Sequence, residues 1–136
     1  MDINQSESYF DANKGSILNL FKTYQMIEIL LFMNLYFPII DKELTLEKAS
    51  KEVNEKTLGK LKIMYLSQHP NDELNIKVLL EAVTKQRNVF MHSLWINMGL
   101  MSKKDFDEYA NRLLDDFKKN ANLLLDKIMR FKVTFE

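Results

Sequence analysis

Residues 16–38, with the sequence SILNLFKTYQMIEILLFMNLYFP, decide the fold class of this chain. Apolar side chains recur along this stretch at steps of three and four residues, which is the period of an amphipathic α-helix. Pro38 lacks a backbone donor and clashes with the preceding turn, so we expect the helix to end there. The predicted buried stripe consists of Ile17, Leu20, Phe21, Tyr24, Ile27, Leu30, Leu31 and Leu35.

This helix does not have the pattern of a membrane span. Its most apolar part, residues 26–40, is shorter than the roughly 20 residues that a spanning helix needs, and Glu28, Asn34 and Pro38 interrupt it. Residues 1–7 lack the basic and apolar regions of a secretory signal. We therefore expect a buried helix in a cytoplasmic protein that has no membrane partner.

The composition favours one all-α domain over residues 1–136. The chain is long enough for one hydrophobic core but too short for two domains. Its three Gly and two Pro are too few for the many tight turns of a β-sandwich or barrel. Nineteen basic residues balance nineteen acidic ones, so a global positive field is excluded, whereas a local basic groove is not. The absence of Cys excludes disulfides, thiolate metal sites and cysteine nucleophiles.

Two more helical segments are predicted between residues 44 and 98. The segment 44–66 is charged with sparse apolar positions, and Gly59 either bends it or divides it into two shorter helices. Pro70 cannot continue that segment, and Asn71 is expected to cap a third helix. The apolar period of the third helix extends to about residues 95–98.

A fourth helix and two terminal segments complete the predicted domain. Ser102 and Asp105 have the spacing of a capping box and precede a long apolar period. Residues 1–15 show no clear period and are expected to form an N-terminal arm, while residues 131–136 are expected to form a short extended tail. Four or five helices with short connections predict a mostly antiparallel bundle.

The third predicted helix carries an unusual polar cluster in residues 87–92, RNVFMH. Thr84, Asn88 and His92 follow one another at steps of four and form a polar stripe. On an ideal helix, with about 100° per residue, Arg87 and His92 are about 140° apart. They can share a site if the helix bends or ends near His92, if Arg87 wraps around the helix surface, or if a second copy of the domain contributes its own pair.

These residue types suit RNA cleavage without a metal ion or other cofactor. A histidine with a pKa near 6.5 can remove the proton of a 2′-hydroxyl or protonate a 5′-oxygen. The planar guanidinium of Arg87 matches phosphate oxygens, and Asn88 can orient the histidine or bind the phosphate. Thr84 and Lys85, which directly precede the cluster, are the expected substrate-binding residues. Two distant histidines without Cys make a poor zinc set.

An Arg followed after four residues by a His, with Asn directly after the Arg, resembles the HEPN superfamily of helical-bundle domains. The position of this motif late in a long amphipathic helix, with another long helix after it, agrees with the resemblance, as do Glu28 and residues 57–61, TLGKL. The resemblance implies a homodimeric endoribonuclease in which Arg87 and His92 are catalytic. It further implies that the cleaved RNA carries a 2′,3′-cyclic phosphate.

The resemblance also implies a biological role. HEPN domains commonly serve as toxins of toxin–antitoxin pairs or as abortive-infection effectors against phage, so an antitoxin protein is an implied partner. Toxins that pair with a minimal nucleotidyltransferase antitoxin often have Tyr two residues after the His, where the partner modifies it. Leu94 occupies that position here, which argues against this mode of control.

The same cluster has a second interpretation, because some HEPN members have lost catalysis. In a non-catalytic helical dimeric interaction or RNA-binding module, Arg87 would form a salt bridge and His92 would form a hydrogen bond within the bundle. In either interpretation, Glu28 is expected to pair with a Lys or Arg in the core or dimer interface or to hold Arg87 in position, since burying an unpaired carboxylate is costly. Two copies of Arg87 and His92 that line one open, positively charged groove favour the nuclease, whereas burial of His92 by Trp95 and its neighbours favours the module.

Overall fold

A computed structural model of the chain describes residues 3–39, 45, 47–48, 51, 57–93 and 100–130. No β-strand occurs in these ranges, so the all-α prediction is confirmed. The elements are helices α1 (Ile3–Ala12), α2 (Lys14–Tyr36), α4 (Leu58–Gln68), α5 (Lys77–Asn88) and α7 (Lys103–Met129), the 3-10 turn η1 (Phe37–Ile39), and the π-helical turn η2 (Val89–Ser93).

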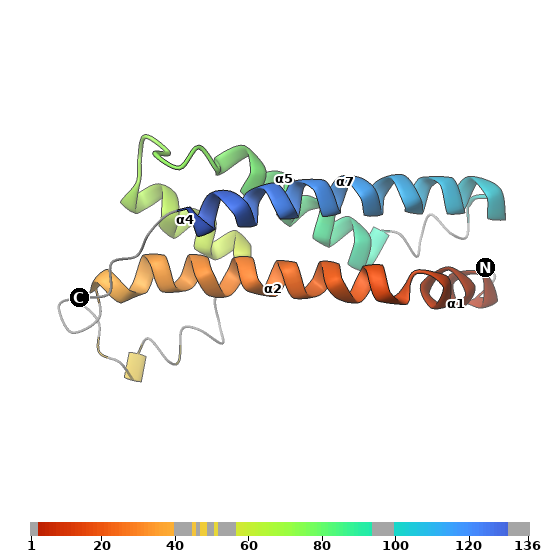
Figure 1. The fold of residues 1–136 in the computed structure, drawn as a ribbon, viewed down its shortest axis with the longest axis horizontal. Helices are drawn as coiled ribbons and strands as arrows, with labels where there is room; N and C mark the ends of the chain where they lie inside the picture. The colour runs from red at the N-terminus through yellow and green to blue at the C-terminus, as the bar shows by residue number, and fades with distance from the viewer. Residues whose placement is uncertain are drawn as a thin grey trace.

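The two longest helices, α2 and α7, lie side by side and run in the same direction (Figure 1). Tyr24 of α2 packs edge-on against Phe117 of α7, with ring centroids 6.3 Å apart. Helix α5 runs in the opposite direction to α7, and α4 lies beside α5. An ion pair of 3.0 Å between Lys62 Nζ of α4 and Glu81 Oε1 of α5 joins these two helices. The antiparallel pairs are therefore α4–α5 and α5–α7, whereas α2 and α7 are parallel.

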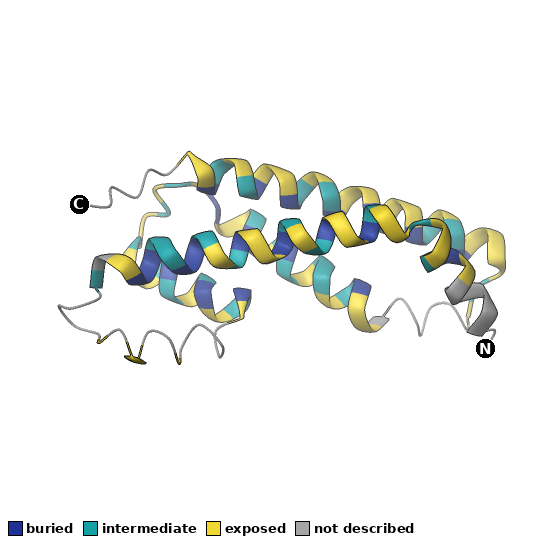
Figure 2. Ribbon diagram, turned by 60° about the horizontal axis from the view of Figure 1, so that its bottom comes forward, coloured by how far each residue is buried: buried dark blue, intermediate teal, exposed yellow. Residues whose placement is uncertain are grey.

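The helices turn their buried faces toward one another to form the hydrophobic core (Figure 2). The stripe predicted for α2 is buried, except that Phe21 and Leu30 are only partly covered at its edges. In α7 the buried positions are Phe106, Ala110, Leu114, Phe117, Ala121, Leu124 and Ile128, and Tyr109 and Leu113 are partly buried beside them. Within the described ranges, no helix is both long enough and apolar enough to cross a membrane.

The N-terminal segment, for which the sequence predicts an arm over residues 1–15, is helical over Ile3–Ala12. Tyr9 of α1 is only 5% exposed and packs edge-on against Phe106 of α7, with ring centroids 5.6 Å apart. Its hydroxyl donates a hydrogen bond of 3.3 Å to Asn111 Oδ1. Among the residues of this helix whose side chains are described, Tyr9 is buried in the core and Phe10 packs partly buried against it.

The third predicted helix begins at Lys77, not at Asn71 as expected. Asp72 and Asn75 adopt left-handed φ angles of 50° and 54°, which interrupt a right-handed helix. Asp72 performs the capping that was expected of Asn71. Its carboxylate accepts the backbone N–H groups of Ile76 at 2.9 Å and of Lys77 at 3.1 Å.

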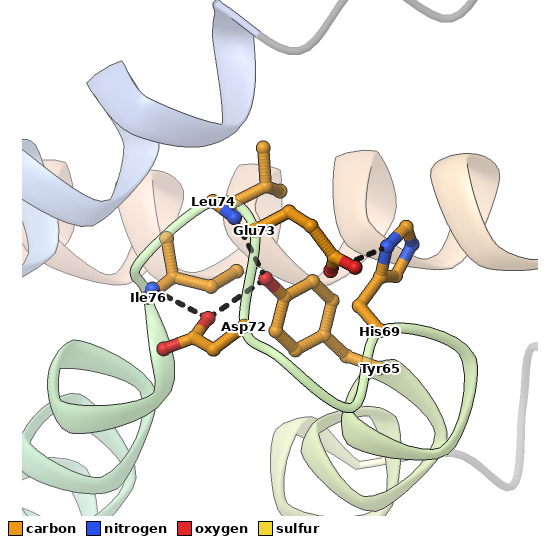
Figure 3. A network of polar contacts seen from close by, with 6 residues as sticks. All are labelled: Tyr65, His69, Asp72, Glu73, Leu74 and Ile76. Carbon is orange, nitrogen blue, oxygen red and sulfur yellow. Dashed lines mark hydrogen bonds and ion pairs between the residues drawn. The ribbon is translucent and has the colours of Figure 1, made fainter.

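Tyr65 anchors the turn between α4 and α5 (Figure 3). Its hydroxyl donates to Asp72 Oδ1 at 2.8 Å and accepts the backbone N–H of Leu74 at 3.1 Å. The ring of His69 stacks on the Tyr65 ring, with centroids 5.0 Å apart, and His69 Nδ1 lies 3.1 Å from Glu73 Oε2. His69 is thus part of a structural turn.

The ends of the other predicted helices are partly described. Helix α4 begins at Leu58 with Gly59 in its first turn, while much of the predicted segment 44–66 before it lies outside the described residues. Ser102 Oγ accepts the backbone N–H of Asp105 at 3.2 Å, which confirms the predicted N-terminal cap of α7. Residues 94–99, including Leu94 and Trp95, and the predicted tail 131–136 are outside the described ranges.

Candidate functional site

The polar cluster lies where α5 changes from α-helical to π-helical geometry. Arg87 and Asn88 are the last residues of α5, and His92 lies in the π-helical turn η2. In a π turn, each backbone N–H bonds to the carbonyl five residues earlier and not four. Side chains five residues apart within the turn therefore lie nearer to the same face than they do in an α-helix. Single π turns in helices frequently coincide with functional sites.

Phe90 holds this π turn against the core. Its side chain is 1% exposed, and its ring makes edge contacts with three aromatic rings from three helices. The centroids lie 6.0 Å from Phe10, 6.2 Å from Phe21 and 6.4 Å from Phe117. With Phe90 directed inward, His92 is exposed to solvent. The burial of Phe90 thus leaves His92 at the surface.

An open cleft of about 540 Å³ lies between α4 and α5 and extends to η2. His92 and Asn88 both line it, together with Thr84 and the exposed Lys85. All four are residues that the sequence singled out. The full lining is Gly59, Lys62, Ile63, Glu81, Thr84, Lys85, Asn88, Val89 and His92.

A second pocket, of about 260 Å³, lies on the other side of Asn88. It is formed by α2, by the beginning of α4 and by the last turns of α5. Gly59, Thr84 and Asn88 line both pockets, so these three residues form the boundary between them. The lining is Tyr24, Glu28, Thr57, Gly59, Thr84, Arg87 and Asn88.

Arg87 lines the smaller pocket, and not the cleft that contains His92. Its Nη1 donates a hydrogen bond of 3.2 Å to Asn88 Oδ1, and its guanidinium carbon lies 5.9 Å from the centroid of the Tyr24 ring. Asn88 is therefore the residue that connects the two halves of the motif. Within one chain, the structure brings Asn88 together with each of Arg87 and His92 but places those two in separate pockets.

Glu28 connects α2, α4 and the motif. Burial raises the pKa of Glu28, while the charge of Arg87 and a hydrogen bond from the backbone N–H of Leu58 act in the opposite direction. The Glu28 carboxylate thus takes up one of the free amides at the start of α4, where Thr57 makes no side-chain cap. Burial, together with the negative charge of Glu28, raises the pKa of the neighbouring Tyr24 hydroxyl to about 12.

The charges around the cleft are mixed. Lys62 and Lys85 contribute positive charge, and Glu81 is paired with Lys62. Thr84 Oγ1 is buried and has no hydrogen-bond partner among the described residues. Those residues also contain no group of three or more His, Cys, Asp or Glu side chains suited to a metal ion.

Sequence reasoning missed Lys62 and Ile63 of α4, which line the cleft. These two residues carry no motif of their own, because only the packing of α4 against α5 brings them to the cluster. Thr57 and Gly59 belong to the stretch 57–61 that the sequence had singled out, and Glu28 was visible as a carboxylate within an apolar helix.

Comparison with known proteins adds no identification: no family model, no curated protein and no solved structure matches the chain. The HEPN resemblance therefore stays a prediction that depends mainly on residues 87–92.

Proposed function

We propose that this chain is a metal-independent endoribonuclease of the HEPN type that acts as a toxin or a phage-defence effector in the cytoplasm. One observation carries the proposal. The exposed His92 shares an open cleft with Asn88, and Asn88 in turn holds the Arg87 guanidinium at 3.2 Å. A general acid or base, a phosphate ligand and an orienting amide are thus adjacent in one helix and its π turn.

In the proposed reaction, neutral His92 removes the proton from a ribose 2′-hydroxyl. The 2′-oxygen attacks the adjacent phosphorus, and the bond from phosphorus to the 5′-oxygen breaks. The products are a 2′,3′-cyclic phosphate and a 5′-hydroxyl, whose proton comes from an imidazolium or water. Arg87 stabilises the charge that develops on the phosphate oxygens, while Thr84 and Lys85 bind the RNA.

Arg87 must approach the phosphate for this reaction. Its flexible side chain can turn from the Tyr24 ring toward the boundary at Asn88, or a second copy of the chain can supply its own Arg87 to the cleft. The second route agrees with the homodimer implied by the HEPN resemblance. An antitoxin would then act by covering the cleft or preventing the dimer.

The engaged position of Arg87 favours one alternative, a non-catalytic dimeric interaction or RNA-binding module. In that case the contacts of Arg87 with Tyr24 and Asn88 would be structural. The exposure of His92 favours the nuclease instead, because a histidine that only stabilises the bundle would be covered.

RNA cleavage in EDTA by the wild type, His92→Ala and Arg87→Ala tests the proposal. The wild type is expected to leave cyclic-phosphate ends, and each variant to lose activity by about 10²-fold or more, as for the loss of a general acid–base group. His69→Ala is the matched control, because His69 is the only other histidine and lies in the α4–α5 turn. Full activity in both cluster variants would refute the assignment, and no cleavage by a folded wild type would favour the module.

A further inference from the structure

The smaller pocket has the size of a site for one nucleobase. Its volume of about 260 Å³ is below the roughly 300–1,000 Å³ of pockets that enclose whole drug-sized ligands. It shares Gly59, Thr84 and Asn88 with the cleft that contains His92. A base in the smaller pocket would therefore direct its own ribose and phosphate toward the cleft.

The polar groups of this pocket include one unusual acceptor. The Glu28 carboxylate is partly buried and receives a hydrogen bond from the backbone N–H of Leu58. A carboxylate has about four lone-pair sites, so it retains capacity for further donors. Burial raises the pKa of Glu28 in spite of the nearby Arg87 charge, as expected for a carboxylate that lacks enough donors.

We propose that the smaller pocket binds a guanine base of the RNA substrate and that Glu28 selects guanine. Guanine presents two adjacent donors, the N1–H and the 2-amino group, which one carboxylate can accept together. Uracil has a single N–H on this edge, and adenine and cytosine have a single amino group. Reading the Watson–Crick edge of an unstacked base is the usual way in which proteins recognise single-stranded RNA.

This inference deepens the proposed function, because it names the base next to the cleaved phosphate. It can nevertheless be tested without any cleavage. The probes are the four nucleoside 3′-monophosphates and inosine 3′-monophosphate, which lacks the 2-amino group. Their binding to the full chain is measured by calorimetry in EDTA.

The wild type is expected to bind guanosine 3′-monophosphate at least tenfold more tightly than the other three nucleotides. Inosine 3′-monophosphate should fall in between. Glu28→Gln should lose the preference, because an amide offers one acceptor oxygen and places an NH₂ group against the guanine donors. The glutamine oxygen can still accept the Leu58 N–H, so we expect this variant to stay folded. Glu108→Gln, which changes an exposed glutamate of α7 that lines neither pocket, should keep the preference.

A second variant tests the location of the pocket. A Cβ added at Gly59 would meet only Thr57 Oγ1, at 3.9 Å, so the fold has room for a side chain there. Gly59→Leu should fill the boundary between the pockets and abolish nucleotide binding while circular dichroism and thermal melting remain those of a folded helical protein.

Two results would overturn the inference: equal binding of all four nucleotides by the wild type, or an unchanged guanine preference in Glu28→Gln. The outcomes also separate the two proposals. Guanine selectivity without RNA cleavage would leave the pocket standing and refute the nuclease. Cleavage that shows no guanine preference, with equal nucleotide binding, would refute the pocket alone.

Discussion

Asp72 is the residue on which the connection between α4 and α5 depends. Its carboxylate accepts the Tyr65 hydroxyl and the backbone N–H groups of Ile76 and Lys77. Burial by itself would raise the pKa of Asp72, but these hydrogen bonds, together with the charge of Lys127, hold it below its ordinary value. The charged carboxylate is therefore the form that stabilises the fold.

Replacing Asp72 with Ala is expected to reduce the free energy of unfolding by about 1–3 kcal/mol, because a helix cap and the partner of the buried Tyr65 hydroxyl are lost together. Urea unfolding at pH 7 measures the change. The matched control is Asn71→Ala, which alters the exposed neighbour and should stay within about 0.5 kcal/mol. Equal effects of both variants would show that the Asp72 hydrogen bonds contribute nothing to stability.

The contribution of Asp72 also depends on pH. A carboxyl group whose pKa is lower in the folded state adds stability that is fully present above its unfolded pKa, for which the ordinary value is 3.8. This stability is lost as the pH falls through the lower folded value. The difference in unfolding free energy between the wild type and Asp72→Asn should therefore shrink between pH 5 and pH 2. A difference that stayed constant over this range would contradict the assigned role of the charge.

At the scale of single elements, the π turn η2 determines how the motif is presented. Residues 87 and 88 still belong to α5, whereas residues 89–93 form the π turn. Phe90 is the residue that fixes this turn, through ring contacts with α1, α2 and α7. The direction of His92 is thus a consequence of how Phe90 packs.

Phe90→Ala should destabilise the chain by about 3–5 kcal/mol, the usual range for a fully buried aromatic side chain. Denaturant unfolding measures this, with Met91→Ala as the control, since Met91 is adjacent in the same turn and 41% exposed. We expect the control to change stability by about 0.5 kcal/mol or less. A loss below about 1 kcal/mol for Phe90→Ala would mean that the turn is not fixed by this side chain.

At the scale of the whole molecule, the positions of Arg87 and His92 bear on whether one chain or two chains form the proposed catalytic site. Arg87 and His92 line different pockets on either side of Asn88. If two copies face each other across the cleft, the Arg87 of one can meet the His92 of the other. A symmetric dimer would then contain two such composite sites.

This arrangement predicts complementation between two inactive variants. Mixed dimers of Arg87→Ala and His92→Ala would contain one intact composite site, so random mixing should restore about a quarter of the wild-type cleavage rate. Cleavage assays before and after subunit exchange measure the recovery, and differently tagged chains verify that mixed dimers form. If mixed dimers are present and remain inactive, both residues must act within one copy.

The all-α class, the buried stripe of α2, the cap of α7 and the residues of the polar cluster could all be predicted from the sequence. These features are local, because helical period, capping residues and motif spacing depend on neighbours along the chain. Glu28 could be singled out for the same reason, since a carboxylate within an apolar run is visible in the sequence. The HEPN resemblance and the catalytic roles of Arg87 and His92 stay predictions.

Other features depend on how the helices pack and on the turns between them. Helix α1 owes its place to Tyr9 contacts with α7, and the late start of α5 is set by the bonds among Tyr65, Asp72 and the following amides. The direction of His92 depends on the π turn that Phe90 anchors, and the two pockets that separate it from Arg87 exist only because α4 packs beside α5. The Tyr9 and Phe90 contacts and the packing of α4 join segments distant in the chain, whereas the Asp72 bonds span only four to seven residues of an irregular turn. Apolar periodicity encodes neither kind of contact.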